Sequence, residues 1–182
     1  MLAAIAGTLG NVSEGAEALR FDGRVHLDGA DLTHTPTAQR GIGLLFQDAL
    51  LFAHLTVAEN LLFAVPPGQR AQRQSAVQQA LAEADLAGFG DRDPATLSGG
   101  QRARVALMRA LLAQPRALLL DEPFSRLDVP LRAAMRALVW QTLARHGLPA
   151  VLVTHDPADI PPGAQVLALP DLGPDFHGGP DA

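Results

Sequence analysis

Short apolar runs alternate along the chain with longer stretches of helical periodicity. The runs at 117–120 and 150–153 are apolar at every position, which is typical of strands covered on both faces of a sheet. A third apolar run lies at 42–46. Because strands that alternate with helical segments favour parallel pairing, this pattern predicts an α/β domain with a largely parallel sheet.

Helical periodicity fills the stretches between these runs. Apolar residues recur at helical spacing after Pro130, a favourable first-turn residue, and Gly147 is expected to end that helix. Another helix is expected from Gln101 to Ala113, and one more around Ser75, whose hydroxyl would cap it. The stretch 56–113 is therefore predicted to be a mostly helical insertion between sheet elements.

Other expectations concern the two ends of the chain. Residues 23–29 alternate and finish in an Asp-Gly pair, which predicts a hairpin or a strand and turn. Asp171–Ala182 contains Gly, Pro and Asp, so a frayed tail is expected there. The apolar opening Met1–Gly10 lacks the positive region of a secretory signal, and no apolar stretch approaches the roughly 20 residues that span a bilayer.

Composition narrows the classes of function. With 182 residues, 48% of them hydrophobic and 18% charged, the chain is predicted to be one globular domain. A net charge of -5 argues against an extended surface for nucleic-acid phosphates. All 14 basic residues are arginines, so no lysine is present to grip a phosphate, and the absence of cysteine excludes disulfides and thiolate metal sites.

A glycine-rich motif precedes the helix expected from residue 101. It consists of Leu97, Ser98, Gly99, Gly100 and Gln101. Glycines at a helix N-terminus expose backbone N–H groups where the helix dipole favours anions, so the loop is suited to a phosphate. Taken alone, a Ser-Gly-Gly turn is more often a plain entry to a helix.

Polar residues follow each predicted strand of the sheet. Gln47 follows the run at 42–46, Asp121 and Glu122 follow the run at 117–120, and His155 follows the last run. Open α/β sheets bind ligands at this end of their strands. One of the two carboxylates could hold hydrated Mg²⁺ and the other could polarise water, although a solvated acidic pair beginning a loop is the simpler interpretation.

Together these motifs resemble the ATP-binding cassette ATPases, the nucleotide-binding subunits of ABC transporters. The resemblance runs from Met1 to about Leu169. It assigns the family's motifs as follows: the Q-loop at Gln47, the signature at Leu97–Gln101, the Walker B strand at Ala117–Asp121, the D-loop at Ser125–Asp128 and the switch histidine at His155.

The resemblance implies a division of labour at the ends of the strands. Asp121 would bind Mg²⁺ through its water shell, and Gln47 would contribute to both the metal and the nucleotide site. Glu122 would act as general base toward the attacking water, and His155 would contact the γ-phosphate of ATP.

The resemblance also implies a head-to-tail dimer of two ATP-binding subunits. Ser98, Gly99 and Gly100, with Leu97 and Gln101 beside them, would hold the γ-phosphate of a nucleotide on the opposite subunit. Asp128 would lie near the surface that the two subunits share.

The implied fold is a P-loop NTPase-like α/β domain, with a mostly parallel sheet, flanking helices and a mostly helical inserted subdomain. Residues 1–55 would be part of the catalytic core, 56–113 the helical subdomain, 114–170 the rest of the core and 171–182 a flexible tail.

One departure from the family is the phosphate-binding motif G-x-x-x-x-G-K-[ST], which does not occur in the sequence. Residues 2–7 resemble the helix that follows this motif in the family, so the core would be incomplete. Weak ATP binding by this chain alone and marginal stability are therefore expected. Two explanations stay open: a shortened copy of an ordinary ATPase, or a degenerate subunit that supplies its signature face to an intact partner.

The functional expectation is an ATPase subunit that powers a membrane transporter. The segment 46–55 looks most like those of bacterial importers for small ions or solutes. Expected partners are transmembrane permease subunits, a second ATP-binding subunit and a solute-binding protein, on the cytoplasmic face of the membrane. The alternatives are a non-catalytic regulatory subunit and a soluble cassette acting in translation or DNA repair, the latter disfavoured by the acidic charge.

Overall fold

The computed structural model describes residues 2–8 and 23–168 of the chain. The helices are α1 (Leu2–Ala6), α2 (Val57–Ala64), α3 (Arg70–Glu83), α4 (Gly99–Leu112) and α5 (Val129–His146). The strands are β1 (His26–Leu27), β2 (Ala30–Asp31), β3 (Ile42–Leu45), β4 (Ala117–Asp121) and β5 (Ala150–Val153). Short 3₁₀ turns lie at Thr37–Gln39, Pro94–Thr96 and Pro157–Asp159. The predicted tail at 171–182 lies outside the described residues.

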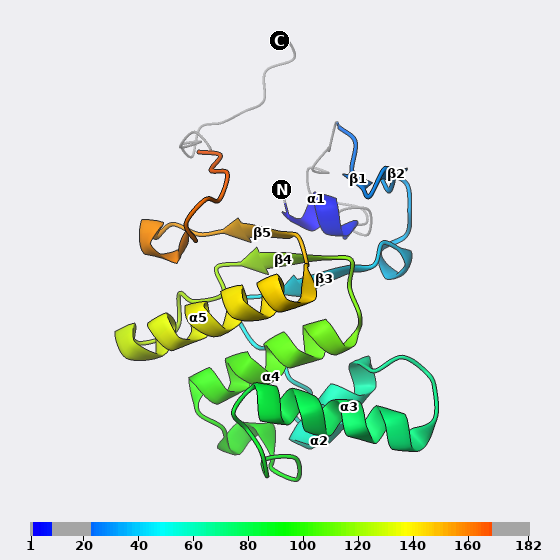
Figure 1. Ribbon diagram of the computed structural model, residues 1–182, viewed down its shortest axis with the longest axis vertical. Helices are drawn as coiled ribbons and strands as arrows, with labels where there is room; N and C mark the ends of the chain where they lie inside the picture. Colours follow the sequence, from blue (N-terminus) through cyan, green and yellow to red (C-terminus); the bar gives the residue numbers. More distant parts are fainter. Residues whose placement is uncertain (1, 9–22, 169–182) are drawn as a thin grey trace, which may run out of the picture.

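In the part of the chain that the structure describes, a parallel sheet of three strands forms the centre of the fold, in the order β3-β4-β5 (Figure 1). Leu45 of β3 pairs with Leu120, and Asp121 of β4 pairs with Val153. The predicted parallel sheet is confirmed, and the carboxyl ends of its three strands lie at the same edge. The residues that follow these strands therefore meet at that edge.

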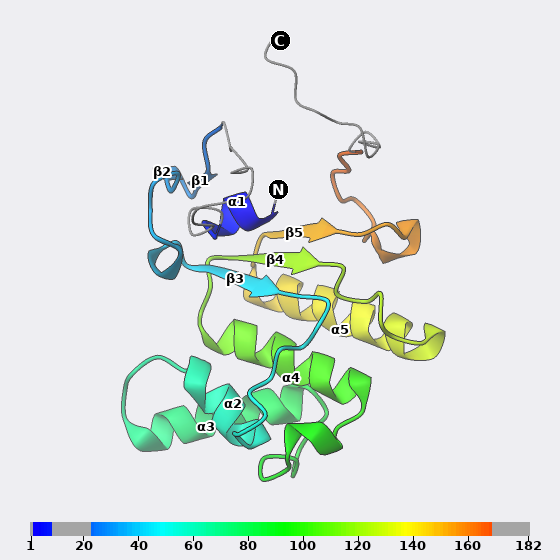
Figure 2. The same cartoon turned by 180° about the vertical axis from the view of Figure 1, so that it is seen from behind.

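Helices cover both faces of the sheet. Figures 1 and 2 show α1 on one face and α4 and α5 on the other, with α2 and α3 beyond α4. Leu118 and Leu120 of β4 are fully buried in the large core that includes residues of α4 and α5. Leu119 points the other way and packs with Leu2 and Ala6 of α1. The continuous apolar pattern of β4 thus serves two separate cores, as expected for a strand covered on both sides.

The stretch between β3 and β4 is helical, as predicted. It holds α2, α3 and α4, and α2 begins at a capping box in which Thr56 and Glu59 bond each other's backbone N–H groups. The prediction that Ser75 caps a helix is wrong, because α3 already begins at Arg70 and Ser75 lies inside it. The Pro-Pro-Gly sequence just upstream breaks the chain, so helical geometry starts directly after that turn.

Helix α5 has the boundaries that the sequence predicted. Asp128 caps its N-terminus, with Oδ1 accepting from the Leu131 N–H at 3.0 Å. At the other end Gly147 has φ +61°, a left-handed conformation that glycine adopts without a steric penalty. The predicted hairpin near the N-terminus is confirmed as well, with β1 and β2 antiparallel and Asp28 and Gly29 at positive φ in the turn.

One edge of the sheet is formed by β5. Within residues 2–8 and 23–168, β5 hydrogen-bonds to a strand on one side only, which is β4. Val151 on β5 is 40% exposed, whereas Leu118 and Leu120 on β4 are 0% exposed. The most buried strand and the most exposed strand of the sheet are therefore neighbours.

Candidate functional site at the strand ends

The ends of β4 and β5 bring an acidic and a basic side chain together. Nδ1 of His155, just after β5, lies 2.8 Å from Oε1 of Glu122, just after β4. The imidazole is mostly exposed, with 71% of its surface accessible, and the Glu122 carboxylate is largely covered at 24%. One ring nitrogen is thus held by the carboxylate, and little else covers the ring.

The backbone at Glu122 has an uncommon conformation. Its φ is +47°, in a region that residues with a Cβ rarely adopt. Residues in such conformations are found most often at functional sites. The conformation is held by two bonds: the Glu122 N–H donates to the Val153 carbonyl at 3.0 Å, and the Ser125 hydroxyl donates to the Glu122 carbonyl at 2.8 Å. The strand end is therefore fixed from both sides.

The second carboxylate oxygen of Glu122 is available for another partner. Oε2 is buried and makes no hydrogen bond within the described residues. A buried carboxylate oxygen without a donor is costly, so this atom is suited to accept from a bound water. The position supports chemistry in which water is oriented and deprotonated.

The donor set at this edge is compatible with hydrated Mg²⁺. Asp121 ends β4, and Gln47 lies exposed two residues beyond β3, the strand paired with β4. No group of three or more His, Asp or Glu residues in the described part of the chain forms a ready metal cage. Magnesium is usually bound through one or two carboxylates together with waters and substrate phosphates. Asp121 with the Gln47 amide therefore suits Mg²⁺ better than it suits an ion that needs a full cage of protein ligands.

The predicted glycine-rich motif forms the N-terminus of α4. Ser98 is the N-cap: its Oγ accepts from the Gln101 N–H, and the Gln101 side chain accepts from the Ser98 N–H at 2.9 Å. Leu97 is buried in the core, whereas Ser98 and Gly99 are exposed. The helix begins two residues before the expected residue 101, because the capping box satisfies its first turn despite the glycines.

The N-termini of α4 and α5 touch. A Cβ on Gly100 would lie 2.5 Å from both δ carbons of Leu131, which is closer than real Cβ contacts. The glycine therefore permits the first turns of the two helices to pack. Because Asp128 caps α5, it lies one turn from this contact, and Figure 1 shows both helix N-termini on the side of the molecule where the strands end.

The predicted site residues form two groups. Glu122 and His155 are joined directly, and the Gln47 loop is tied to the segment before α5 by an ion pair between Asp48 and Arg126. Leu97–Gln101 and Asp128 lie at the tips of α4 and α5. No hydrogen bond or ion pair in the described ranges joins the signature motif to Glu122 or His155.

One buried carboxylate beside the site was not predicted from the sequence. Asp159 is 1% exposed and accepts from Arg132, Thr154 and, at longer range, Arg136. Although burial opposes ionisation, the hydrogen bonds from Arg132 and Thr154 hold the pKa of Asp159 below its ordinary value. The sequence signal is weak, because an aspartate in a proline-containing turn usually faces solvent.

A second missed residue, Arg109, connects α4 to the loop after Gln47. Its guanidinium donates to the carbonyls of Ala49 and Leu50 at 3.3 and 3.0 Å and lies over the ring of Phe52. Burial lowers the pKa of Arg109. The helix that carries the signature motif is thus bonded directly to the loop that follows β3.

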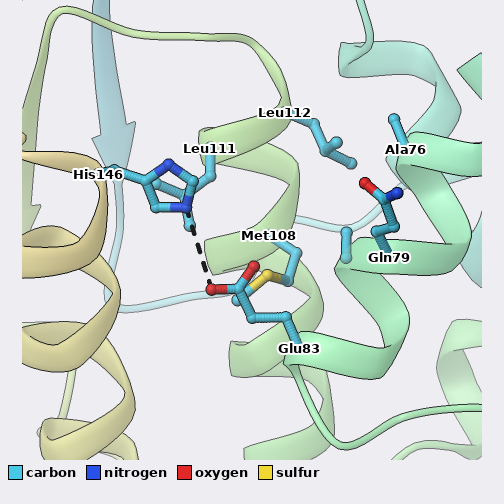
Figure 3. Close-up of a pocket in the computed structure, with 8 residues that line it drawn as sticks. Ala76, Gln79, Glu83, Met108, Leu111, Leu112 and His146 are labelled. Carbon is cyan, nitrogen blue, oxygen red and sulfur yellow. Dashed lines mark ion pairs between the residues drawn. The ribbon is translucent and has the colours of Figure 1, made fainter.

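A small cavity between α3, α4 and α5 is separate from this site. It has a volume of about 150 Å³, and Glu83 and His146 face each other across part of it at 4.0 Å (Figure 3). His146 ends α5, whose 18 residues span about 27 Å, so the cavity lies at the opposite end of that helix from Asp128. It adds nothing to the candidate site.

Comparison with known proteins identifies relatives over most of the chain. The family model described as ABC transporter matches residues 8–125. The uncharacterised ABC transporter ATP-binding protein YnjD of Escherichia coli K12 is 50% identical over 163 residues, covering 89% of this chain and 75% of that protein.

Two relatives with named substrates also match. The thiamine import ATP-binding protein ThiQ of Rhizobium meliloti is 43% identical, covering 83% of this chain and 64% of that protein. The sulfate/thiosulfate import ATP-binding protein CysA of Gloeobacter violaceus is 45% identical, covering 75% and 40% respectively. The chain thus spans less than two thirds of the length of both import proteins.

A solved structure is similar in fold. It is a dimeric ATP-binding cassette in a post-hydrolysis state bound to ADP and Pi, with a TM-score of 0.63 and 29% identity, covering 76% of this chain and 65% of that one. Within residues 2–8 and 23–168, no helix has both the length and the apolar character needed to cross a membrane.

Proposed function

The chain belongs to the ABC transporter family, and from that premise we propose that it is an ATP-binding subunit of an importer. The subunit would couple binding and hydrolysis of Mg-ATP to movement of a solute across a membrane. The names of relatives that import thiamine and sulfate or thiosulfate support the direction of transport. The observation that carries the proposal is the Glu122–His155 pair at the strand ends.

In this proposal Glu122 is the general base. Oε1 is held by His155 at 2.8 Å, and the buried, unbonded Oε2 is the atom that would accept the proton of the attacking water. The other ring nitrogen of the exposed His155 would contact the γ-phosphate while Nδ1 stays on Glu122. Bound Mg²⁺ would neutralise charge on the phosphates, held by Asp121 through its water shell with help from Gln47.

The signature motif would act on a nucleotide bound by a second subunit. Its Ser98 hydroxyl already accepts from the Gln101 N–H, which leaves the N–H groups of Gly99 and Gly100 without a partner inside the helix. These groups point out of the N-terminus of a 14-residue helix, where the dipole favours a phosphate. The dimeric state of the solved relative supports pairing of two subunits, which we place head to tail with Asp128 near the shared surface.

A permease would bind beside the Gln47 loop. Leu50 and Phe63 are exposed by 56% and 69%, and the ring of Phe52, two residues after Leu50, meets that of Phe63 at 5.0 Å. Exposed apolar side chains grouped in this way mark a protein contact. The subunit would then sit on the cytoplasmic face of the membrane through its permease, with a solute-binding protein as a further component of the importer.

The lack of lysine favours a second candidate function for the 182-residue chain when it acts without additional residues. No G-x-x-x-x-G-K-[ST] motif occurs in the 182 residues, so the phosphate contacts that this motif supplies have no source within them. The chain by itself would bind ATP weakly and hydrolyse none. It could still serve as a non-catalytic partner that offers its signature face to an intact cassette.

One experiment tests both candidates. The purified chain is mixed with an intact cassette whose own catalytic base has been replaced by glutamine, and the mass of the complex is measured by light scattering with and without Mg-ATP. We expect a heterodimer that forms only with Mg-ATP. A mixture that stays monomeric with Mg-ATP would refute the proposed nucleotide-bridged pairing.

A further inference from the structure

The loop that carries His155 is anchored by a buried carboxylate four residues further on. Asp159 lies in the 3₁₀ turn Pro157–Asp159 and is 1% exposed. A buried carboxylate destabilises a fold unless donors compensate for the lost water, and Asp159 has several.

The donors to Asp159 come from two elements. Nε and Nη2 of Arg132 donate to Oδ1 and Oδ2 at 3.0 and 2.6 Å, a two-pronged arrangement. The Thr154 hydroxyl donates to Oδ2 at 2.8 Å, and Arg136 lies 3.5 Å from Oδ1. Asp159 therefore joins helix α5 to the residue immediately before His155.

The hydroxyl of Thr154 is used twice. It donates to Asp159 and accepts from the Asp156 N–H at 3.1 Å, so it connects the residues on both sides of His155. Asp156 in turn caps the 3₁₀ turn by accepting from the Ala158 N–H at 2.8 Å and pairs with Arg132 at 3.2 Å. The backbone that flanks His155 is thus defined by side-chain bonds that converge on one carboxylate.

The far end of this network is the start of α5. The Arg132 N–H donates to the carbonyl of Asp128 at 2.8 Å, and Asp128 is the N-cap of that helix. The loop of His155 and the segment that ends at Asp128 therefore share one anchor, which consists of Asp159 and Arg132.

The orientation of the His155 ring depends on this backbone. With 71% of the side chain exposed, packing contributes little to holding the ring, and its hydrogen bond to Glu122 requires Nδ1 to arrive within 2.8 Å of Oε1. A small displacement of residues 154–156 would break that bond without unfolding the sheet.

We propose that Asp159 is a positioning residue, which through Thr154 and Arg132 holds His155 in hydrogen-bonding register with Glu122. It does not touch the reacting atoms itself. A catalytic role for this positioning rests on the proposed function. The hydrogen bond between His155 and Glu122 that it explains is present in the chain without nucleotide or partner.

The test reads the hydrogen bond of His155 in the chain without nucleotide. Protein labelled with ¹⁵N at histidine is studied by long-range proton–nitrogen NMR at about pH 8, where an ordinary imidazole is neutral. The His155 signals are identified by their loss in His155→Ala. We expect the wild-type ring to show the Nδ1-protonated form, because Nδ1 faces the acceptor Oε1 of Glu122.

Two variants remove the anchor in different ways. Asp159→Asn removes the charge that Arg132 and Arg136 face, and Thr154→Val keeps the shape of the residue while deleting its hydroxyl. Both are expected to lose the Nδ1-protonated form and to show the mixed signals of a solvated imidazole. Asp85→Asn, at a carboxylate that is 97% exposed, is the matched control and is expected to leave His155 unchanged.

A purely structural role predicts a different result. In that case the two variants would lower the melting temperature while the His155 signals below that temperature stayed as in the wild type, and this outcome would overturn the proposal. If Asp159→Asn does not fold, Thr154→Val decides alone. Failure of the ATP-dependent pairing experiment would count against the proposed function but would leave this result intact, so the two failures are distinguishable.

Discussion

The Nδ1 atom of His155 lies 2.8 Å from the Oε1 atom of Glu122, so the ends of β4 and β5 are joined by side chains as well as by the sheet. The other carboxylate oxygen is buried without a donor. Because Oε1 is already bonded to His155, Oε2 is the oxygen of Glu122 at which the proposed base would accept a proton. This relationship leads to the first prediction.

Glu122→Gln should stop turnover while sparing ATP binding. The test uses a fusion that places the phosphate-binding loop of an intact cassette ahead of Met1. Loss of a general base lowers the rate by roughly a hundredfold or more, whereas an amide of the same shape leaves the nucleotide contacts in place. Phosphate release and ATP retention measure the two effects, and normal turnover would remove Glu122 from the role of base.

Ser98→Arg should block ATP-dependent pairing with an intact cassette. The substitution puts bulk and charge at the exposed N-cap of α4, where the proposed phosphate of the partner would lie. Pairing is measured by light scattering with Mg-ATP. Ser75→Arg is the matched control, since Ser75 is exposed on α3, and equal pairing by both variants would show that the motif is not at the interface.

Gly100→Ala should destabilise the fold by about 1–3 kcal/mol, the usual cost of overpacking. The added Cβ would meet Leu131 at 2.5 Å. In a Leu131→Ala background the same change should cost less, because the clashing atoms are gone. Denaturant midpoints give both values. Gly99→Ala, whose Cβ meets nothing within 4 Å, is the control, and equal effects at the two glycines would contradict the packing account.

Arg109→Met should loosen the loop after β3. Arg109 donates to the Ala49 and Leu50 carbonyls, and the Phe52 N–H in the same loop is protected by its bond to Asn60 at 2.8 Å. Losing two bonds worth about 1 kcal/mol each should speed hydrogen exchange at Phe52 by roughly thirtyfold.

The control for this change is Arg104→Met on the same helix. Arg104 donates to the Ala84 carbonyl rather than to the loop, so its loss should leave exchange at Phe52 near the wild-type rate. Equal acceleration by both variants would indicate a general loosening of α4.

The contribution of Asp159 to stability should disappear in acid. Its pKa in the folded protein is below the ordinary 3.8, so the carboxylate stabilises the fold above about pH 4 and loses that effect as the pH falls through the folded pKa. At neutral pH, Asp159→Asn should cost about 3 kcal/mol, since it leaves Arg132 without its buried partner.

The measurement compares wild-type and Asp159→Asn unfolding at several pH values. The difference between them should shrink as the pH falls below about 4. Asp91→Asn, at an exposed carboxylate, should show little difference at any pH. A gap between wild type and Asp159→Asn that is independent of pH would mean that the charge of Asp159 does not matter.

The sequence was sufficient to predict the strand ends and the residues at them. Continuous apolar runs identify β3, β4 and β5, and a polar residue after a buried strand has to lie at the sheet edge. Parallel register sets Asp121 beside Val153, which brings the residues that follow the two strands, Glu122 and His155, close to each other. Local patterns in the sequence are therefore sufficient to locate the strands and the polar residues at their ends.

Contacts between distant segments could not be predicted in this way. Asp159 is buried only because Arg132 and Arg136 on α5 reach it from 27 and 23 residues away, and nothing local to the turn indicates burial. Gly100 reads as a phosphate-binding glycine, but its close approach to Leu131 depends on how α4 and α5 pack. The start of α3 was missed because serine is a cap only where the preceding backbone leaves the helix.

The order of strands has a consequence for synthesis of the protein. β4, the central strand, leaves the ribosome more than seventy residues after β3, since the two begin at residues 117 and 42. Within residues 2–8 and 23–168, β4 is the strand that pairs with β3, so β3 stays unpaired until then, while α2, α3 and α4 are already complete. Nascent chains should therefore acquire helix first and sheet late, and parallel pairing across so long a separation is slow. During this interval the apolar strand β3 is unpaired and can be bound by chaperones.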